Sequence, residues 1–345
     1  MRQLLNDYRG DQSQTSPRKL FFLGSPGAAV FDHHFRYSCT PFFQERQQEL
    51  GIGLPEGLLL VDAKEPIACG PGDFFICFDP DESARALIEY YTSNIPKEAC
   101  LLLNYENPVA YHYRKWRFES EILDKFAYVF SSAAHFCDGK KFFWIPAWNF
   151  VNDFETNKTI RALECLPSPK SSFLVVNPIL TGLDVHRRRL EIISEFVAHR
   201  RSFDIFGHQS MLEHPLTQAW KACYRGALPF APQPYRFEKK LDVFRSYKFT
   251  LVIENTFIDG YLSEKLAEPL AVLSVPVYFG APDISRFMPE LFEAGVINGH
   301  RFNSTAALIR YLEELSDEEY ESRQRCIESH RSDYFALTSR YNIWN

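Results

Sequence analysis

Two short apolar runs on either side of a helix-like segment, within residues 247–280, constrain the fold of this chain more than any other feature. The runs at 249–253 and 275–279 have the length and the β-branched content of buried parallel strands. A turn at Gly260 leads from the first run into a segment with leucines at helical spacing: Leu262, Leu266, Leu270 and Leu273. A strand, a helix and a strand in this order form a βαβ unit, so the sequence predicts a parallel sheet. Pro269 predicts a kink or a short first turn in the helix.

Polar residues collect where the first of these strands ends and the helix begins. Glu254 and Asn255 follow the strand, and Tyr261, Glu264 and Lys265 surround the start of the helix. In open α/β sheets this crevice is where ligands bind, and a helix N-terminus there favours an anion. The pattern therefore predicts an anion-binding site, with the Lys265 ammonium beside free backbone N–H groups.

Each of these residues also has a purely structural interpretation. Lys265 is equally well explained by spacing as a surface lysine paired with Glu268. Glu264 suits the helix dipole, Tyr261 suits packing, and Asn255 is a good turn former at a strand end. On spacing alone, the two sets of interpretations stay open.

Strand-like and helix-like segments alternate along most of the chain, which is typical of Rossmann-like domains. The segment Pro167-Ser168-Pro169 predicts a linker, so we expect one domain at 1–166 and a second at 167–345. The predicted strands outside the first unit are 19–24, 57–62, 73–78, 99–104, 126–131, 141–145, 173–176 and 203–206. The other predicted helices are 81–91, 187–198, 305–315 and 318–332, and residues 210–236, with four prolines, are expected to be irregular.

The stretch at 247–280 resembles the sugar-nucleotide signature of the α-1,3/4-fucosyltransferases, glycosyltransferase family 10. The matching elements are YKF at 247–249, IENT at 253–256, Tyr261, SEK at 263–265 and VPVYFG at 275–280. Two positions depart from the family pattern: Ile253 stands for an aromatic residue and Thr256 for a serine. The resemblance implies a GT-B architecture, in which two Rossmann-like domains face each other across a cleft, and GDP-fucose as the donor.

The resemblance also implies roles for individual residues. Tyr261 and Lys265 would contact the diphosphate, Glu264 would accept hydrogen bonds from the ribose, and Asn255 would hold the loop or touch the donor. Arg189 would stabilise the departing diphosphate, because the family shows an arginine followed by apolar positions three, four and seven residues later. Ile192, Ile193 and Phe196 satisfy that register for Arg189 rather than for its neighbours Arg187 and Arg188. The tandem arginines still leave open which of the three meets the diphosphate, and a solvated arginine cluster is the structural alternative.

Glu106 is the predicted catalytic base. It follows the predicted strand 99–104, at a carboxyl end where α/β sites form. The family has a Gly-Glu-Asn-type tripeptide after this strand, and its glutamate is taken as the base; here Tyr105 stands where glycine is frequent. A carboxylate among aromatic residues could have a raised pKa, which suits a base near neutral pH. Without the resemblance, a glutamate beside Asn-Pro reads as a turn residue.

The predicted reaction is an inverting, metal-independent transfer of L-fucose from GDP-fucose to a glycan hydroxyl. An α-1,3 linkage to an acceptor containing N-acetylglucosamine is favoured over α-1,4 or α-1,2. No cofactor is expected, although stimulation by a divalent metal is compatible with the prediction; His33, His34 and His135 lack metal-binding spacing. The alternatives are a GT-B transferase that uses another nucleotide sugar and a non-catalytic protein that binds one.

Composition limits the partners and the cellular location. The 345 residues carry a net charge of −6, which argues against nucleic-acid binding. No apolar run approaches the roughly 20 residues of a membrane span, and the N-terminus lacks the apolar region of a signal peptide. The eight cysteines include no CxxC pair, so reduced thiols are expected. Animal members of the family that this chain resembles are Golgi proteins with an N-terminal anchor, so the resemblance and the lack of an anchor here lead us to expect a bacterial cytoplasmic enzyme, either free or at the inner face of the membrane. The oligomeric state stays open.

Overall fold

The computed structural model describes residues 18–24, 58–78, 80, 82–104, 119–134, 137–145, 170–176, 184–199, 203–206, 215–226 and 237–337. These residues separate into two compact units, with the division between residues 147 and 148, and each unit contains one parallel sheet. The predicted α/β class is therefore confirmed. The predicted domain boundary at 166/167 lies outside the described residues and stays a prediction.

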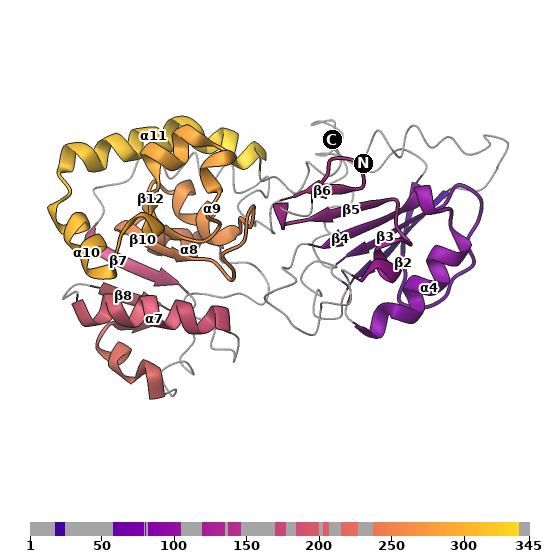
Figure 1. Ribbon diagram of the computed structural model, residues 1–345, viewed down its shortest axis with the longest axis horizontal. Coiled ribbons are helices and arrows are strands. Elements are labelled where there is room, and N and C mark those ends of the chain that lie inside the picture. Colours follow the sequence, from indigo (N-terminus) through magenta and orange to yellow (C-terminus); the bar gives the residue numbers. More distant parts are fainter. Residues whose placement is uncertain are drawn as a thin grey trace. The chain divides into compact units, whose positions relative to one another are not determined.

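The N-terminal unit is built on a six-stranded parallel sheet with the strand order β2-β1-β3-β4-β5-β6 (Figure 1). Helix α4 packs on this sheet through Tyr91, whose ring lies 4.9 Å from the ring of Phe21 and 5.0 Å from that of Phe75. All three side chains are fully buried, so they form the centre of this core. The elements are β1 (Arg18–Gly24), β2 (Leu58–Asp62), β3 (Phe74–Phe78), α4 (Arg85–Asn94), β4 (Cys100–Asn104), α5 (Ser120–Leu123), β5 (Tyr128–Ser131) and β6 (Phe142–Trp144).

The C-terminal unit has a second six-stranded parallel sheet, with the order β12-β11-β10-β7-β8-β9. Its strands are β7 (Lys170–Val176), β8 (Phe203–Phe206), β9 (Tyr224–Gly226), β10 (Tyr247–Ile253), β11 (Val275–Phe279) and β12 (Ile297–Asn298). Its helices are α7 (Asp184–His199), α8 (Phe237–Phe244), α9 (Glu264–Ala271), α10 (Thr305–Glu314) and α11 (Asp317–Leu337), with a 3₁₀-helix at Pro215–Ala222.

The strand order reverses between β10 and β7, and this reversal fixes where a ligand can bind. The chain moves from β10 to β11 on one side and from β7 to β8 on the other. Because such crossovers are right-handed, α9 and α7 cover opposite faces of the sheet, as Figure 1 shows. A crevice is expected beyond the carboxyl ends of the two strands at such a switch point.

The βαβ unit predicted from the sequence forms β10, α9 and β11, but its helix is shorter than predicted. Pro269 lies inside α9, and the helix ends at Ala271. Leu273 was predicted as the last apolar position of the helix; instead its backbone is left-handed, with a φ of 59°. Its N–H group donates to Leu270 and that of Ser274 donates to Pro269, which is the Schellman arrangement that terminates helices.

Residues 210–236 are not wholly irregular, as the sequence had suggested. They include the 3₁₀-helix and β9, an edge strand of three residues. Strand β12, with two residues, and helix α8 were also missed. Strands of two or three residues are too short to show a periodic pattern, and they form where a neighbouring strand offers hydrogen bonds.

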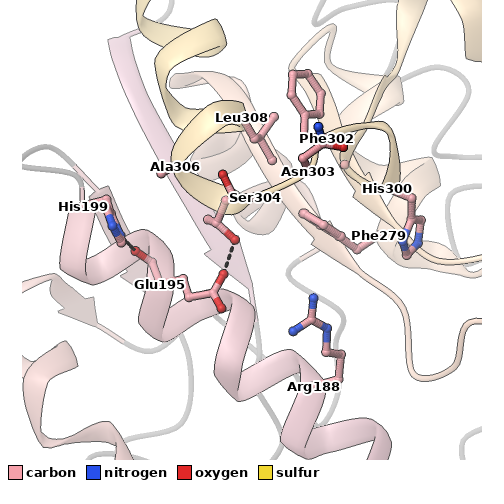
Figure 2. A pocket seen from close by; sticks show the side chains of 12 residues that line it. Arg188, Glu195, His199, Phe279, His300, Phe302, Asn303, Ser304, Ala306 and Leu308 are labelled. Carbon is pink, nitrogen blue, oxygen red and sulfur yellow. Dashed lines mark hydrogen bonds between the residues drawn. The ribbon is translucent and has the colours of Figure 1, made fainter.

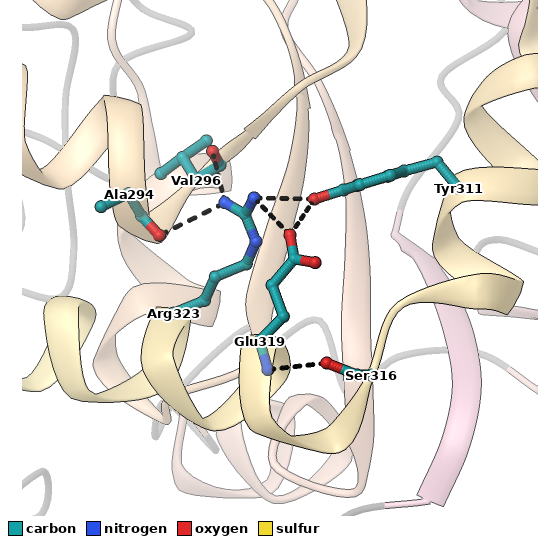
Figure 3. Close-up of polar contacts among 6 residues, drawn as sticks. All are labelled: Ala294, Val296, Tyr311, Ser316, Glu319 and Arg323. Carbon is teal, nitrogen blue, oxygen red and sulfur yellow. Dashed lines mark hydrogen bonds and ion pairs between the residues drawn. The ribbon is translucent and has the colours of Figure 1, made fainter.

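The long helix α11 is attached to the rest of its unit by Arg323 (Figure 3). Its guanidinium donates to the backbone oxygens of Ala294 and Val296, at 3.2 and 3.5 Å, and to the Tyr311 hydroxyl at 2.7 Å. It also pairs with Glu319 one turn earlier, at 3.1 Å. Arg323 therefore links α11 to the chain before β12 and to α10.

No helix among the described residues is both long enough and apolar enough to span a membrane. The six cysteines that the structure describes are all free thiols.

Candidate functional site

The predicted residues of the C-terminal unit lie at the switch point of its sheet. Asn255 follows β10, and Lys265 stands in the first turn of α9, on one face of the sheet. Arg189 comes from α7 on the opposite face. The fold therefore brings together residues that are up to 76 positions apart in the sequence.

Arg189 lies on the buried face of α7. Its exposed fraction is 2%, whereas Arg187 and Arg188 are exposed. The register inferred from the sequence explains this difference, because Ile192, Ile193 and Phe196 on the same face are also buried.

Asn255 receives a hydrogen bond from Arg189. The guanidinium Nη2 donates to the Asn255 Oδ1 over 2.5 Å, so the end of β10 and the helix α7 are connected by a side-chain contact. This contact agrees with the interpretation of Asn255 as a residue that holds the loop. The contact of either residue with a donor stays a prediction.

Lys265 is paired with Glu264, and not with Glu268 as the structural alternative required. Its Nζ lies 2.9 Å from the Glu264 Oε1, and the two side chains are 17% and 27% exposed. Burial lowers the pKa of Lys265, but the charges of Glu264 and Glu254 outweigh this effect and raise it above its ordinary value. The positive charge of Arg189 acts in the opposite direction and lowers the Lys265 pKa, which places the two cations near each other.

Glu254, immediately after β10, is a fully buried carboxylate. Its two oxygens accept hydrogen bonds from the Ser263 N–H at 3.0 Å and from the Ser263 hydroxyl at 2.5 Å. Burial raises the pKa of Glu254 to about 6, and the attraction of Lys265 partly offsets this rise. Sequence reasoning noted Glu254 only as one of several polar residues and missed this contact.

Ser263 caps α9, since its hydroxyl oxygen accepts from the Lys265 N–H at 3.3 Å. The backbone N–H of Leu266 also bonds to Ser263, through its carbonyl oxygen. The N–H groups of Ser263, Lys265 and Leu266 therefore bond within the chain, in contrast to the prediction that free N–H groups at this helix start would face a diphosphate.

Tyr261 is 2% exposed, which agrees with the packing alternative. The hydroxyl of the buried Tyr278 donates to the Tyr261 backbone oxygen at 3.3 Å and accepts from the Ala281 N–H at 2.9 Å. The turn before Tyr261 forms as predicted, with Gly260 at a φ of 78°. A role of the Tyr261 hydroxyl in donor binding stays a prediction.

The predicted base Glu106 lies outside the described residues. The strand before it ends where the sequence predicted, at Asn104, whose side chain is fully buried. Ser131, at the end of the neighbouring β5, is buried at the same edge of the sheet. Glu106 therefore follows a carboxyl edge that carries buried polar side chains.

A cavity of about 530 Å³ lies between α7, the end of β11 and the start of α10 (Figure 2). Arg188, Phe279, His300 and Ser304 are among its lining residues, but none of the predicted site residues is. Glu195 on its wall bonds to Thr305. The cavity is on the α7 face and is distinct from the Arg189–Lys265 cluster.

Among the residues that the structure describes, no group of three or more histidine, cysteine, aspartate or glutamate side chains is arranged to hold a metal ion. The cluster at the switch point instead combines two cations with two carboxylates. Chemically, it can bind an anion through Arg189 and Lys265 and accept hydrogen bonds from hydroxyl groups through Glu264.

The sequence comparisons match part of this chain to fucosyltransferases. Residues 176–328 match the family model described as glycosyltransferase family 10 (fucosyltransferase), C-terminal part. An alpha-(1,4)-fucosyltransferase of Arabidopsis thaliana is 41% identical over 85 residues, which are 23% of this chain and 20% of that protein. A GDP-fucose protein O-fucosyltransferase 3 of Danio rerio is 38% identical over 79 residues, 23% of this chain and 17% of that protein. The chain thus matches about a fifth of the length of these curated relatives.

The fold is similar to solved structures over nearly the whole chain. A crystal structure of an alpha1,3-fucosyltransferase aligns with a TM-score of 0.54 and 14% identity, covering 98% of this chain and 96% of that one. A glycosyltransferase from Rickettsia africae aligns with a TM-score of 0.52 and 12% identity, covering 96% and 97%. These alignments confirm the predicted GT-B type of fold. Residues 176–328 are thus similar to the C-terminal part of glycosyltransferase family 10.

Proposed function

We propose that this protein is an inverting fucosyltransferase that uses GDP-fucose as its donor. One observation carries the proposal: within the family-matched segment, Arg189 and Lys265 lie close together at the switch point of the sheet, each held by a polar partner. Two cations at this position suit a nucleoside diphosphate, whose charge grows as the sugar departs.

Donor binding would replace the contact between Lys265 and Glu264 with contacts from each of them to the donor. The Lys265 ammonium would leave Glu264 for the diphosphate, and the freed Glu264 carboxylate would accept hydrogen bonds from the ribose hydroxyls. Arg189 would contribute a second charge to the diphosphate while it remains bonded to Asn255. The pairing of Lys265 with Glu264 holds both side chains in place before the donor arrives.

In the transfer step, an acceptor hydroxyl oxygen would attack the anomeric carbon of fucose. The bond from that carbon to the diphosphate oxygen breaks on the opposite side, and the diphosphate leaves with the electron pair. Glu106 would take the acceptor proton. This displacement needs no metal ion, so we expect chelation to leave the reaction intact.

For the acceptor, we propose a glycan that contains N-acetylglucosamine, with α-1,3 linkage. A second candidate is a hydroxyl group of a protein, because several of the similar relatives are named GDP-fucose protein O-fucosyltransferase 3. A different nucleotide sugar as donor, or binding without turnover, are the remaining alternatives.

The experiment that tests the proposal follows GDP release from GDP-fucose in the presence of β-galactosyl-N-acetylglucosamine acceptors, and separately of folded protein acceptors, with and without EDTA. GDP release that depends on a glycan supports the proposal, and release that depends on a protein supports the second candidate. Donor binding without release for any acceptor would favour a binding protein. If no GDP-sugar binds, the proposed donor site is wrong.

A further inference from the structure

Glu254 is the most deeply buried ionisable group near the candidate donor site, yet the proposed reaction gives it no role. It is fully buried. Both of its carboxylate oxygens bond to one residue, Ser263. A buried charge is costly, so a carboxylate kept here with two hydrogen bonds points to a requirement beyond packing.

The hydrogen bonds form a chain with a fixed direction. The Ser263 hydroxyl has one proton, and its oxygen must accept from the Lys265 N–H to cap the helix. The proton therefore has to point elsewhere, and the ionised Glu254 oxygen at 2.5 Å accepts it. Glu254 thus fixes the rotamer that lets Ser263 cap α9.

The strand and loop around Glu254 hold it rigidly. Its own N–H donates to the Phe279 backbone oxygen at 2.8 Å, which ties the end of β10 to β11. On the other side, a methyl group added at Gly280 would lie 2.7 Å from the Glu254 Cγ, so there is no free space. The carboxylate consequently has one position from which it can hold Ser263.

We propose that Glu254 is a positioning residue for the donor site: through Ser263 it fixes the start of α9 and thereby the side chains of Glu264 and Lys265. This inference rests on the proposed function, in which those two side chains bind the GDP portion of the donor. Glu254 itself would not touch the donor.

The test uses the full-length protein and GDP as the probe, with calorimetric affinity and melting temperature measured for each variant. Glu254→Gln replaces one of the two accepting oxygens with an NH2 donor, so it no longer accepts from both the N–H and the hydroxyl of Ser263 with two oxygens, and Ser263→Ala removes the cap. We expect each to weaken GDP affinity by about 3- to 10-fold, on the scale of a lost helix cap. The double variant should bind GDP as tightly as the single variant with the lower affinity, because both changes break the same chain of hydrogen bonds. Ser263→Thr, which retains a capping hydroxyl, should restore most of the affinity.

Thr250→Val is the matched control. Thr250 lies in the same strand, is buried, and bonds to the Ser274 hydroxyl at 2.8 Å, away from the carboxyl end of β10. Its replacement should lower the melting temperature and leave GDP affinity unchanged. If Glu254→Gln lowers only the melting temperature, or if the double variant shows the sum of two independent losses, Glu254 is merely structural and the inference fails.

Two further outcomes are distinguishable. If Glu254→Gln does not fold, Ser263→Ala decides: unchanged GDP affinity in that variant would overturn the inference, and weaker affinity that Ser263→Thr restores would support it. If the parent protein binds neither GDP nor GDP-fucose, the proposed function fails first, and the inference fails with it.

Discussion

At the scale of single residues, we expect donor binding to depend most on the Lys265 side chain. Replacement by alanine removes the ammonium and leaves Glu264 as a negative charge facing the diphosphate. A charge-assisted hydrogen bond contributes about 1.5–3 kcal/mol, so we expect GDP-fucose to bind roughly 10- to 100-fold more weakly.

The control for this substitution is Lys248→Ala. Lys248 lies at the opposite end of β10 and pairs with the exposed Asp317 at 2.8 Å. Donor titration calorimetry should show parent-like affinity for this variant. Equal losses in both variants would mean that general charge, rather than the position of Lys265, governs binding.

Glu254 should also leave a signature in the pH dependence of stability. Its pKa rises from the ordinary value of 4.5 to about 6 because the carboxyl group is buried. The folded protein therefore binds this proton more tightly than the unfolded chain. Protonation of Glu254 therefore adds about 2 kcal/mol to the free energy of unfolding below pH 4.5, and this contribution is lost as the pH rises through 6.

The measurement is the free energy of unfolding between pH 4 and 7.5, for the parent and for Glu254→Gln. The difference, parent minus variant, should fall across the window from 4.5 to 6, since the amide does not titrate. Parallel curves for the two proteins would show that the pKa of Glu254 is not raised.

At the scale of elements, Arg323 holds α11 against its unit. Arg323→Met keeps the stem of the side chain but leaves two backbone oxygens and the Tyr311 hydroxyl without their donor. We expect a loss of about 2–3 kcal/mol in unfolding free energy, measured by urea denaturation.

Arg325→Met on the same helix provides the comparison. Arg325 and its partner Glu321 are each 64% exposed, with 3.6 Å between their charged atoms. Such surface pairs contribute little, so the change should stay below about 0.5 kcal/mol. Similar losses in both variants would contradict the role assigned to Arg323.

At the scale of the whole molecule, the two units divide the proposed work. The donor cluster lies entirely in the C-terminal unit, whereas the predicted base Glu106 belongs to the N-terminal one. A fragment of residues 148–339 should therefore bind GDP-fucose within a few-fold of the parent but show no acceptor-dependent GDP release. A folded fragment with no measurable donor affinity would place part of the donor site in the other unit.

The sequence by itself determined the α/β class, most strand positions, and the βαβ unit at 247–280, because the apolar runs there are long enough to show their period. The register also aligned Arg189 with Ile192, Ile193 and Phe196, and the structure buries all four on one face of α7; the contact of Arg189 with the donor stays a prediction. The sequence pattern did not predict the short strands β9 and β12, nor the residue at which α9 ends. They depend on hydrogen bonds from neighbouring strands and turns.

Only the tertiary structure decided how the polar residues are paired. Spacing offered Glu268 as the partner of Lys265, but the fold places Glu264 there. Likewise, Glu254 and Ser263 are nine residues apart, and no periodic pattern joins a strand end to a helix cap. Contacts of this kind depend on how β10, β11 and α9 meet in space, which local sequence does not encode. The sequence thus predicted which polar residues gather at the end of β10 and the start of α9, whereas the packing of the sheet and helices decided which charged groups face one another.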